Sequence, residues 1–163
     1  MARRKRIYYN CAVYHVTIRG NNKQKVLASD EDKISFLETL NKFKERFEFK
    51  LYGFGLMDNH AHMVIQTNAK ANISKIMQAI NLSYSQKFRR KYNYFGYVWQ
   101  GRFNSNLIES GEYIIECLNY IHNNPVRAKI AEHPKDYPWT SYHFYNGNSC
   151  ALSKFIQVDK FIL

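Results

Sequence analysis

The stretch from Met57 to Gln66 places an Asp-Asn pair between two apolar runs. Such a pair is typical of a turn, and the alternation of polar and apolar residues after it indicates a β-strand. Side chains alternate along a strand, so His60 and His62 are expected on the same face, about 7 Å apart. Two imidazoles at this spacing can bind one metal ion, although such pairs are more often hydrogen-bonded residues at a sheet rim.

The rest of the chain alternates between strand-like and helix-like segments. Apolar residues recur at helical spacing in some stretches and alternate with polar residues in others. The pattern predicts strands over 12–18, 49–56, 60–66 and 103–108, and helices over 29–48, 72–92 and 111–122, with a short basic helix over 125–131. This order favours an α+β, ferredoxin-like sandwich, in which helices pack on one face of an antiparallel sheet.

Two glycines share one face of the second predicted strand. Gly53 and Gly55 lack side chains there, which can allow another backbone or a ligand to approach the sheet closely. A β-bulge or a tightly crossing helix would also explain them. The sequence leaves these readings open.

The length of 163 residues fits a single domain spanning 1–163 with a real hydrophobic core. A basic N-terminal arm (1–8) and a C-terminal tail (about 143–163) carry no pattern that assigns them a structure. No apolar run approaches the ~20 residues needed to cross a membrane, so we expect a cytoplasmic protein. The three cysteines are too far apart to suggest a disulfide framework or a cysteine zinc site.

Positive charge and aromatic residues dominate the composition. The net charge is +11 and aromatic residues make up 16 % of the chain. Single-stranded nucleic acids need cations for their phosphates and flat side chains for their unstacked bases, so this composition favours a nucleic-acid partner. The alternative is a solvated basic surface over an aromatic core. The candidate nucleic-acid contacts are Arg3, Arg4, Lys5, Arg6, Arg19, Arg89, Arg90 and Arg102.

Tyr120 and Asn124 are four residues apart in the third predicted helix and therefore lie on one face of it. A tyrosine beside a metal ion can act as a nucleophile when nearby positive charge or a base activates it. An amide oxygen one turn further along could be a third metal ligand. The alternatives are that Tyr120 packs like other tyrosines and that Asn124 caps a helix beginning at Pro125.

Several short motifs together carry a family resemblance. The run from Met57 to His62, followed by the run from Tyr120 to Ala128, resembles the REP-associated tyrosine transposases, which are single-tyrosine members of the HUH nuclease superfamily. Further matches are the segments 14–21, 100–103 and 133–142. Together these motifs run from residue 3 to about residue 142 in the order found in the family.

The resemblance implies an HUH nuclease fold, with His60 and His62 as metal-binding histidines, Tyr120 as the nucleophile and Asn124 as the third ligand. It also implies Mg²⁺ or Mn²⁺ as the cofactor and single-stranded DNA with hairpins, the repetitive extragenic palindromes, as the partner. The family usually has proline where this chain has Asp58. That carboxylate could add a metal ligand or change the bend.

The implied activity is that of a metal-dependent nuclease and strand transferase, a transposase that forms a covalent 5′-phosphotyrosine intermediate. Two alternatives stay open: a non-catalytic module that binds DNA or RNA hairpins, and a hydrolase that uses water as the nucleophile. Tyr113 and Tyr137 are alternative nucleophiles, and Glu116 could assist proton removal or bind metal. The sequence leaves a monomer and a homodimer equally open.

Overall fold

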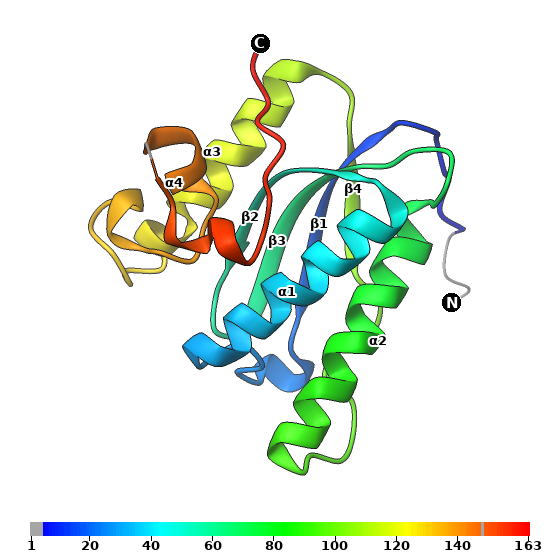
Figure 1. The fold of residues 1–163 in the computed structure, drawn as a ribbon, viewed down its shortest axis with the longest axis vertical. Helices are drawn as coiled ribbons and strands as arrows, with labels where there is room; N and C mark the ends of the chain where they lie inside the picture. The colour runs from blue at the N-terminus through cyan, green and yellow to red at the C-terminus, as the bar shows by residue number, and fades with distance from the viewer. Residues whose placement is uncertain (1–4, 148) are drawn as a thin grey trace.

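A four-stranded antiparallel sheet forms the centre of the protein, for which a computed structural model describes residues 5–147 and 149–163 (Figure 1). The strands lie in the order β2-β3-β1-β4. Their bounds are Val13–Arg19 (β1), Lys50–Leu56 (β2), His60–Gln66 (β3) and Asn104–Ile108 (β4). The α+β, ferredoxin-like class predicted from the element order is confirmed, and each strand begins and ends within one residue of its predicted bounds.

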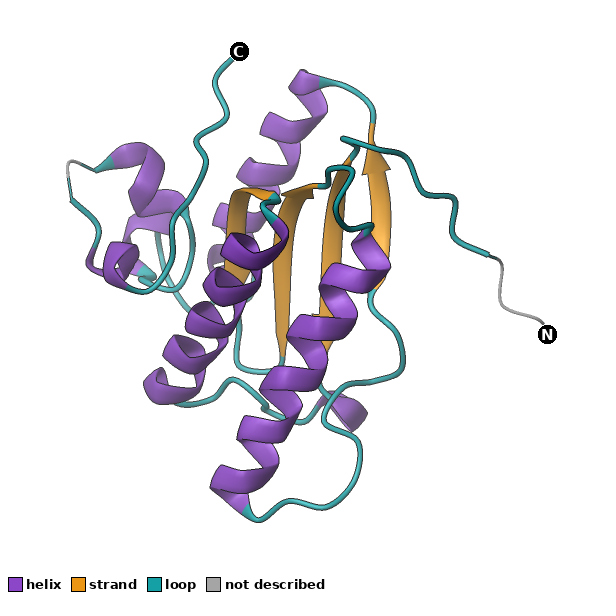
Figure 2. Ribbon diagram, turned by 45° about the vertical axis from the view of Figure 1, so that its right-hand side comes forward, coloured by secondary structure: helices purple, strands orange, loops and turns teal. Residues whose placement is uncertain are grey.

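Two long helices cover one face of the sheet (Figure 2). Helix α1 (Asp30–Phe47) begins after Ser29, whose side chain accepts a hydrogen bond from the amide of Asp32. Helix α2 (Ile73–Tyr92) begins in the same way after Asn72. The caps satisfy amides that the first helical turn leaves unpaired, and the apolar stripes of both helices are buried against β1, β2 and β3.

The third helix, α3 (Gly111–Arg127), lies on the opposite face of the sheet. This corrects the expectation that the helices share one face. The reason lies in the strands, because Tyr52, Val64 and Ile108 point away from α1 and α2 and need apolar cover of their own. Helix α3 supplies that cover with four buried side chains, Ile114, Cys117, Leu118 and Ile121.

The prediction of a separate basic helix over 125–131 is wrong, because α3 continues through Pro125 to Arg127. A proline usually marks a boundary since it lacks an N–H and disfavours helical geometry in the residue before it. Here Pro125 lies in the last turn of α3. Because it has no N–H, the helix lacks only the hydrogen bond that this residue would donate to the carbonyl of Ile121. Packing of Ile121 against β2 holds the helix together across that position.

Gly53 and Gly55 allow α3 to approach β2 closely. A Cβ atom at Gly53 would lie 2.3 Å from Cδ2 of Leu118, and one at Gly55 would lie 2.8 Å from Cγ2 of Ile121. Real side-chain carbons do not come so close, so larger residues would push the helix away from the sheet. The two glycines therefore set the distance between α3 and the strands.

The C-terminal tail covers the free edge of β2. The amide of Asp159 donates to the carbonyl of Leu51, and the carboxylate of Asp159 accepts from the amide of Leu51. Between α3 and this segment lie three short elements, Pro134–Asp136 (η2), Tyr142–Asn146 (α4) and Ala151–Lys154 (η3). A short turn, Asn21–Lys23 (η1), follows β1.

The pairing of Asp159 with Leu51 protects the edge of β2, which would otherwise expose unpaired backbone groups.

We expect Gly53→Ala to lower the free energy of unfolding by about 1–3 kcal/mol, because the added methyl group overpacks the contact with Leu118. Urea unfolding of the wild type and the variant measures the change. In a Leu118→Ala background the obstructing side chain is gone, so the same glycine change should cost less. Equal costs in both backgrounds would show that the contact does not set the helix position.

Candidate active site

Strands β1 and β3 bring five polar side chains to the face of the sheet that α3 covers. Thr17 pairs with His62 across the two strands, and Arg19 pairs with His60. His15 lies two residues before Thr17 and so points to the same face. The rings of His60 and His62 are 5.1 Å apart between centroids, which confirms that this histidine pair shares a face.

Hydrogen bonds orient both histidine rings. Nδ1 of His62 lies 3.0 Å from Nε2 of His15 and 3.2 Å from Oγ1 of Thr17. Nδ1 of His60 lies 2.6 Å from Oδ1 of Asn59, a distance at which the ring N–H donates to the amide oxygen. Because the amide oxygen of Asn59 can only accept, His60 carries its proton on Nδ1 and its lone pair on Nε2, a form that can bind a metal ion. Both partners of His62 Nδ1 can donate or accept, so these contacts orient the ring without fixing its tautomer.

Burial keeps His62 in its neutral form. Its exposed fraction is 6 %, and burial, followed by the neighbouring charges of His15 and His60, lowers its pKa to about 3. Burial, followed by the charge of Arg19, also lowers the pKa of His60. Both rings therefore hold the unprotonated nitrogen that metal coordination requires.

Helix α3 places Tyr120 and Asn124 over this pair. The Tyr120 ring lies 5.8 Å from that of His62 and 6.1 Å from that of His15, and the side chain remains half-exposed. Nδ2 of Asn124 lies 3.5 Å from Nε2 of His60. The structure thus brings together all four residues that the sequence analysis assigned to the reaction centre.

Arg127 fixes the position of Tyr120. Its guanidinium carbon lies 3.9 Å from the centre of the Tyr120 ring, and Nη2 donates a 2.9 Å hydrogen bond to the Tyr120 carbonyl. A cation over an aromatic face is attracted by the ring electrons. Arg127 therefore limits the motion of the half-exposed phenol while adding positive charge beside it.

The donor set fits a divalent cation. Two imidazoles that share a face lie beside the Asn124 amide, whose oxygen and nitrogen can exchange places by a half-turn of the side chain. Within residues 5–147 and 149–163, no three or more His, Cys, Asp or Glu side chains form a metal-binding cluster. The amide of Asn124, which lies next to His60, is the candidate third ligand that the sequence analysis named.

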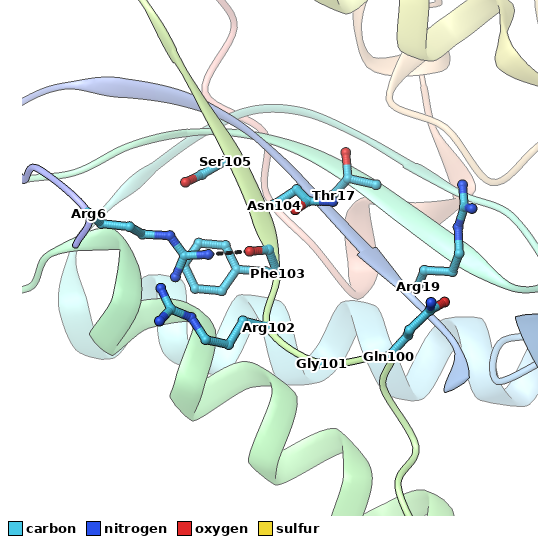
Figure 3. A pocket seen from close by; sticks show the side chains of 9 residues that line it. All are labelled: Arg6, Thr17, Arg19, Gln100, Gly101, Arg102, Phe103, Asn104 and Ser105. Atoms are coloured by element: carbon cyan, nitrogen blue, oxygen red, sulfur yellow. Dashed lines mark hydrogen bonds between the residues drawn. The ribbon is translucent and has the colours of Figure 1, made fainter. Parts of the chain in front are cut away.

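A basic cleft of about 700 Å³ includes Thr17, the neighbour of His62, in its lining (Figure 3). Arg19 and Thr17 line it from β1, while Arg102 and Phe103 line it from the segment before β4. Arg6 of the N-terminal arm lies over the Phe103 ring, 3.6 Å from its centre, and donates to the Phe103 carbonyl. Three predicted DNA-contacting arginines, from segments far apart in the sequence, therefore meet in one cleft.

The other predicted basic contacts lie apart from this cleft. Arg89 donates two hydrogen bonds to the carbonyl of Gly96 and lines a neighbouring groove, and Arg90 is exposed on α2. Lys5 lines a shallow pocket against the arm. Arg3 and Arg4 lie outside the described residues.

The alternative nucleophiles differ in their surroundings. Tyr113 and Glu116 line a small cleft with Tyr120, so both are close to the candidate nucleophile. Tyr137 is buried, its hydroxyl donates a 2.7 Å hydrogen bond to the carbonyl of Leu56, and burial raises its pKa. Tyr137 therefore supports the end of β2.

Three residues of the site were missed by the sequence analysis: His15, Thr17 and Arg127. His15 and Thr17 alternate with apolar residues in β1, so their shared face was visible, but only the register with β3 puts that face beside His62. Arg127 follows Tyr120 by seven residues, or two helical turns. The expected helix end near His122 hid that relation.

A membrane-spanning helix is not found among the described residues. The fold is shared with a solved REP-associated tyrosine transposase bound to a REP hairpin, at a TM-score of 0.73 and 18 % identity over 88 % of this chain and 84 % of that one. A solved transposase of Deinococcus radiodurans matches with a TM-score of 0.52 and 16 % identity, over 75 % of this chain and 97 % of that one.

The sequence itself identifies the family. A Haemophilus influenzae protein named as a REP-associated tyrosine transposase is 25 % identical over 140 residues, which cover 72 % of this chain and 77 % of that protein. The model of the IS200-like transposase family matches residues 8–124, which include β1, both histidines, Tyr120 and Asn124. The resemblance found in the sequence motifs is thereby confirmed, and the chain belongs to the IS200-like transposase family.

Proposed function

We propose that this transposase cleaves and rejoins single-stranded DNA beside hairpins through a covalent bond to Tyr120. The observation that carries the proposal is the placement of half-exposed Tyr120 5.8 Å from the ring of the buried, neutral His62. Thr17, whose Oγ1 lies 3.2 Å from Nδ1 of His62, lines the basic cleft. The relative whose structure contains a REP hairpin supports hairpin DNA as the substrate class.

In the proposed reaction Oη of Tyr120 attacks the scissile phosphorus and loses its proton to solvent. The bond from phosphorus to the 3′ oxygen breaks, and that oxygen leaves as a 3′ hydroxyl after taking up a proton. The 5′ end of the DNA stays joined to Tyr120 through a phosphodiester. Because that bond retains the energy of the original linkage, another 3′ hydroxyl can reverse the step and join two strands.

His60, His62 and Asn124 would hold a divalent cation, Mg²⁺ or Mn²⁺, in this mechanism. When bound, such a cation polarises the scissile phosphate and offsets the negative charge that develops on it. Arg127 keeps the Tyr120 ring in place through its stacking contact. Arg19 and Arg102 would bind the phosphates of the strand that lies in the cleft.

The covalent step is tested with labelled single-stranded DNA that carries palindromes from beside the gene. We expect a protein–DNA band on a denaturing gel, and we expect Tyr120→Phe to reduce its rate of formation by at least about 10³-fold. Tyr113→Phe, from the same cleft, is the matched control and should leave the rate within a few fold. A band that needs Tyr113 would transfer the nucleophile's role to it, and binding without any band would favour the hairpin-binding module.

Removal of the metal should abolish the covalent band. We expect EDTA to stop its formation and excess Mn²⁺ to restore it, whereas His62→Ala should leave hairpin binding intact but require far more Mn²⁺ for cleavage. His133→Ala, at the exposed histidine that precedes η2, should behave as the wild type. A band that persists in EDTA would rule out the metal-dependent mechanism.

The cleft makes a prediction about salt. Arg102→Ala should weaken hairpin DNA binding and reduce the slope of log K against log salt by about 0.7–0.9, the value of one lost phosphate contact. Arg46→Ala, in α1 and outside the cleft, should leave that slope unchanged. Titrations at several salt concentrations provide the measurement. An unchanged slope for Arg102→Ala would place the DNA elsewhere.

A further inference from the structure

The bend between β2 and β3 holds His60, the first of the candidate metal ligands, in position. Its closure comes from the amide of Met57, which donates a 2.9 Å hydrogen bond to the carbonyl of His60. The carbonyl of Asn59 accepts from the amide of Gly20 at 2.8 Å, and the side chain of Asn59 accepts from Nδ1 of His60. The position of Asn59 therefore decides both the ring orientation and the tautomer of His60.

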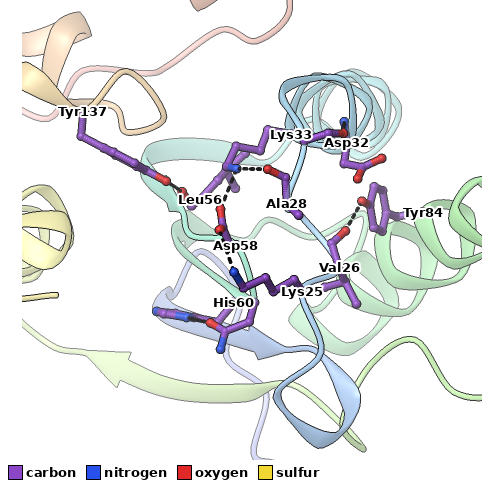
Figure 4. A network of polar contacts seen from close by, with 12 residues as sticks. Lys25, Val26, Ala28, Asp32, Lys33, Leu56, Asp58, His60, Tyr84 and Tyr137 are labelled. Carbon is purple, nitrogen blue, oxygen red and sulfur yellow. Dashed lines mark hydrogen bonds and ion pairs between the residues drawn. The ribbon is translucent and has the colours of Figure 1, made fainter. Parts of the chain in front are cut away.

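A buried lysine from α1 reaches the same bend (Figure 4). Nζ of Lys33 lies 3.0 Å from Oδ1 of Asp58 and 3.3 Å from the carbonyl of Ala28. It also lies 5.8 Å from the centre of the Trp139 ring. The Lys33 side chain is only 4 % exposed. Its ammonium group is therefore surrounded by the Asp58 carboxylate, the Ala28 carbonyl and the Trp139 ring in place of water. An ammonium buried without such partners would be strongly destabilising.

Asp58 is held on its backbone as well as on its side chain. Its carbonyl accepts a 2.8 Å hydrogen bond from the amide of Leu27, just before α1. A second cation, Lys25, lies 3.9 Å from the carboxylate but is largely exposed and adds little. Because the Asp58 carboxylate is itself half-exposed, the buried Lys33 is the contact that fixes its direction, toward α1.

We propose that Lys33 and Asp58 form a positioning pair, which locks the β2–β3 bend so that Asn59 holds His60 ready for metal binding. The inference rests on the proposed function, since it concerns the metal site of that reaction. The chain of contacts runs from α1 through Asp58 to its neighbour Asn59, and from the Asn59 amide oxygen to the ring of His60. Residues that orient metal-binding histidines in this way typically contribute 10–100-fold to metal affinity.

The pair gives Asp58 a role different from that of a metal ligand. If Asp58 bound the cation directly, its removal would weaken binding, and removal of Lys33 would free the carboxylate and leave binding unchanged or stronger. If the two residues position His60 together, loss of either one should weaken binding to a similar extent. Loss of both should then cost no more than loss of one.

The test uses Lys33→Met, Asp58→Asn and the double variant. Methionine keeps the length of the buried stem, and asparagine keeps the shape and turn preference of aspartate while removing its charge. We expect each single variant to raise the Kd for Mn²⁺, measured by electron paramagnetic resonance without DNA, by about tenfold, and the double variant to match the single ones. Nitrogen NMR of the histidine rings in EDTA-treated protein should show the Nδ1–H tautomer of His60 in the wild type. In each of the three variants His60 should lose its preference for that tautomer.

A second ion pair provides the matched control. Lys44 and Asp159 lie 3.0 Å apart between α1 and the C-terminal tail, and the Lys44 side chain is 15 % exposed. We expect both Lys44→Met and Lys33→Met to lower the thermal stability, but Lys44→Met should leave the Kd for Mn²⁺ and the His60 tautomer unchanged. This comparison separates positioning of the site from a general loss of stability.

Three results would overturn the proposal. Weaker Mn²⁺ binding in Asp58→Asn alone would make Asp58 a ligand, an unchanged Kd and tautomer in all variants would make the pair purely structural, and additive losses would make the residues independent. The result that would refute the proposed function is a different one from those that would refute the positioning pair. A wild type that forms no covalent adduct would refute the phosphotyrosine mechanism, whereas the His60 tautomer would still test the positioning pair.

Discussion

The close contact between α3 and the sheet is the constraint on which the rest of the site depends. Gly53 and Gly55 let Leu118 and Ile121 pack where strand side chains would otherwise stand. This approach places Tyr120, which lies between those two residues in the sequence, with its ring 5.8 Å from that of His62. Because side chains in a packed interior have little free space, the separation of Tyr120 from His62 follows from the absence of two methyl groups.

The two faces of the sheet carry different side chains. On one face α1 and α2 build the larger apolar core, and α1 also sends the buried ammonium of Lys33 to the β2–β3 bend. On the other face polar strand side chains meet the polar side of α3. The basic cleft is lined by Thr17 and Arg19 of β1, and Thr17 lies 3.2 Å from the ring nitrogen Nδ1 of His62.

Most of the secondary structure could be predicted from the sequence, because capping residues and apolar periodicity act locally. Ser29 and Asn72 begin α1 and α2 as their capping preferences indicate. The end of α3 could not be predicted, since tertiary packing carries the helix through Pro125 against its local tendency. The tail after α4 has no periodicity, and long-range contacts such as that of Asp159 with Leu51 determine its path.

The candidate site was predictable where its residues belong to motifs, as His60, His62, Tyr120 and Asn124 do. Contacts made across strands or between distant segments were not, because sequence spacing carries no information about register. His15 beside His62 and Lys33 beside Asp58 are both of this kind.

The most direct test of the central claim is to identify the atom that carries the DNA. The protein is incubated with hairpin DNA and Mn²⁺, digested with protease and nuclease, and analysed by mass spectrometry. We expect one modified peptide, with a nucleotide joined through its 5′ phosphate to Tyr120. A nucleotide on any other residue, or cleaved DNA with no modified peptide, would contradict the mechanism proposed for this transposase.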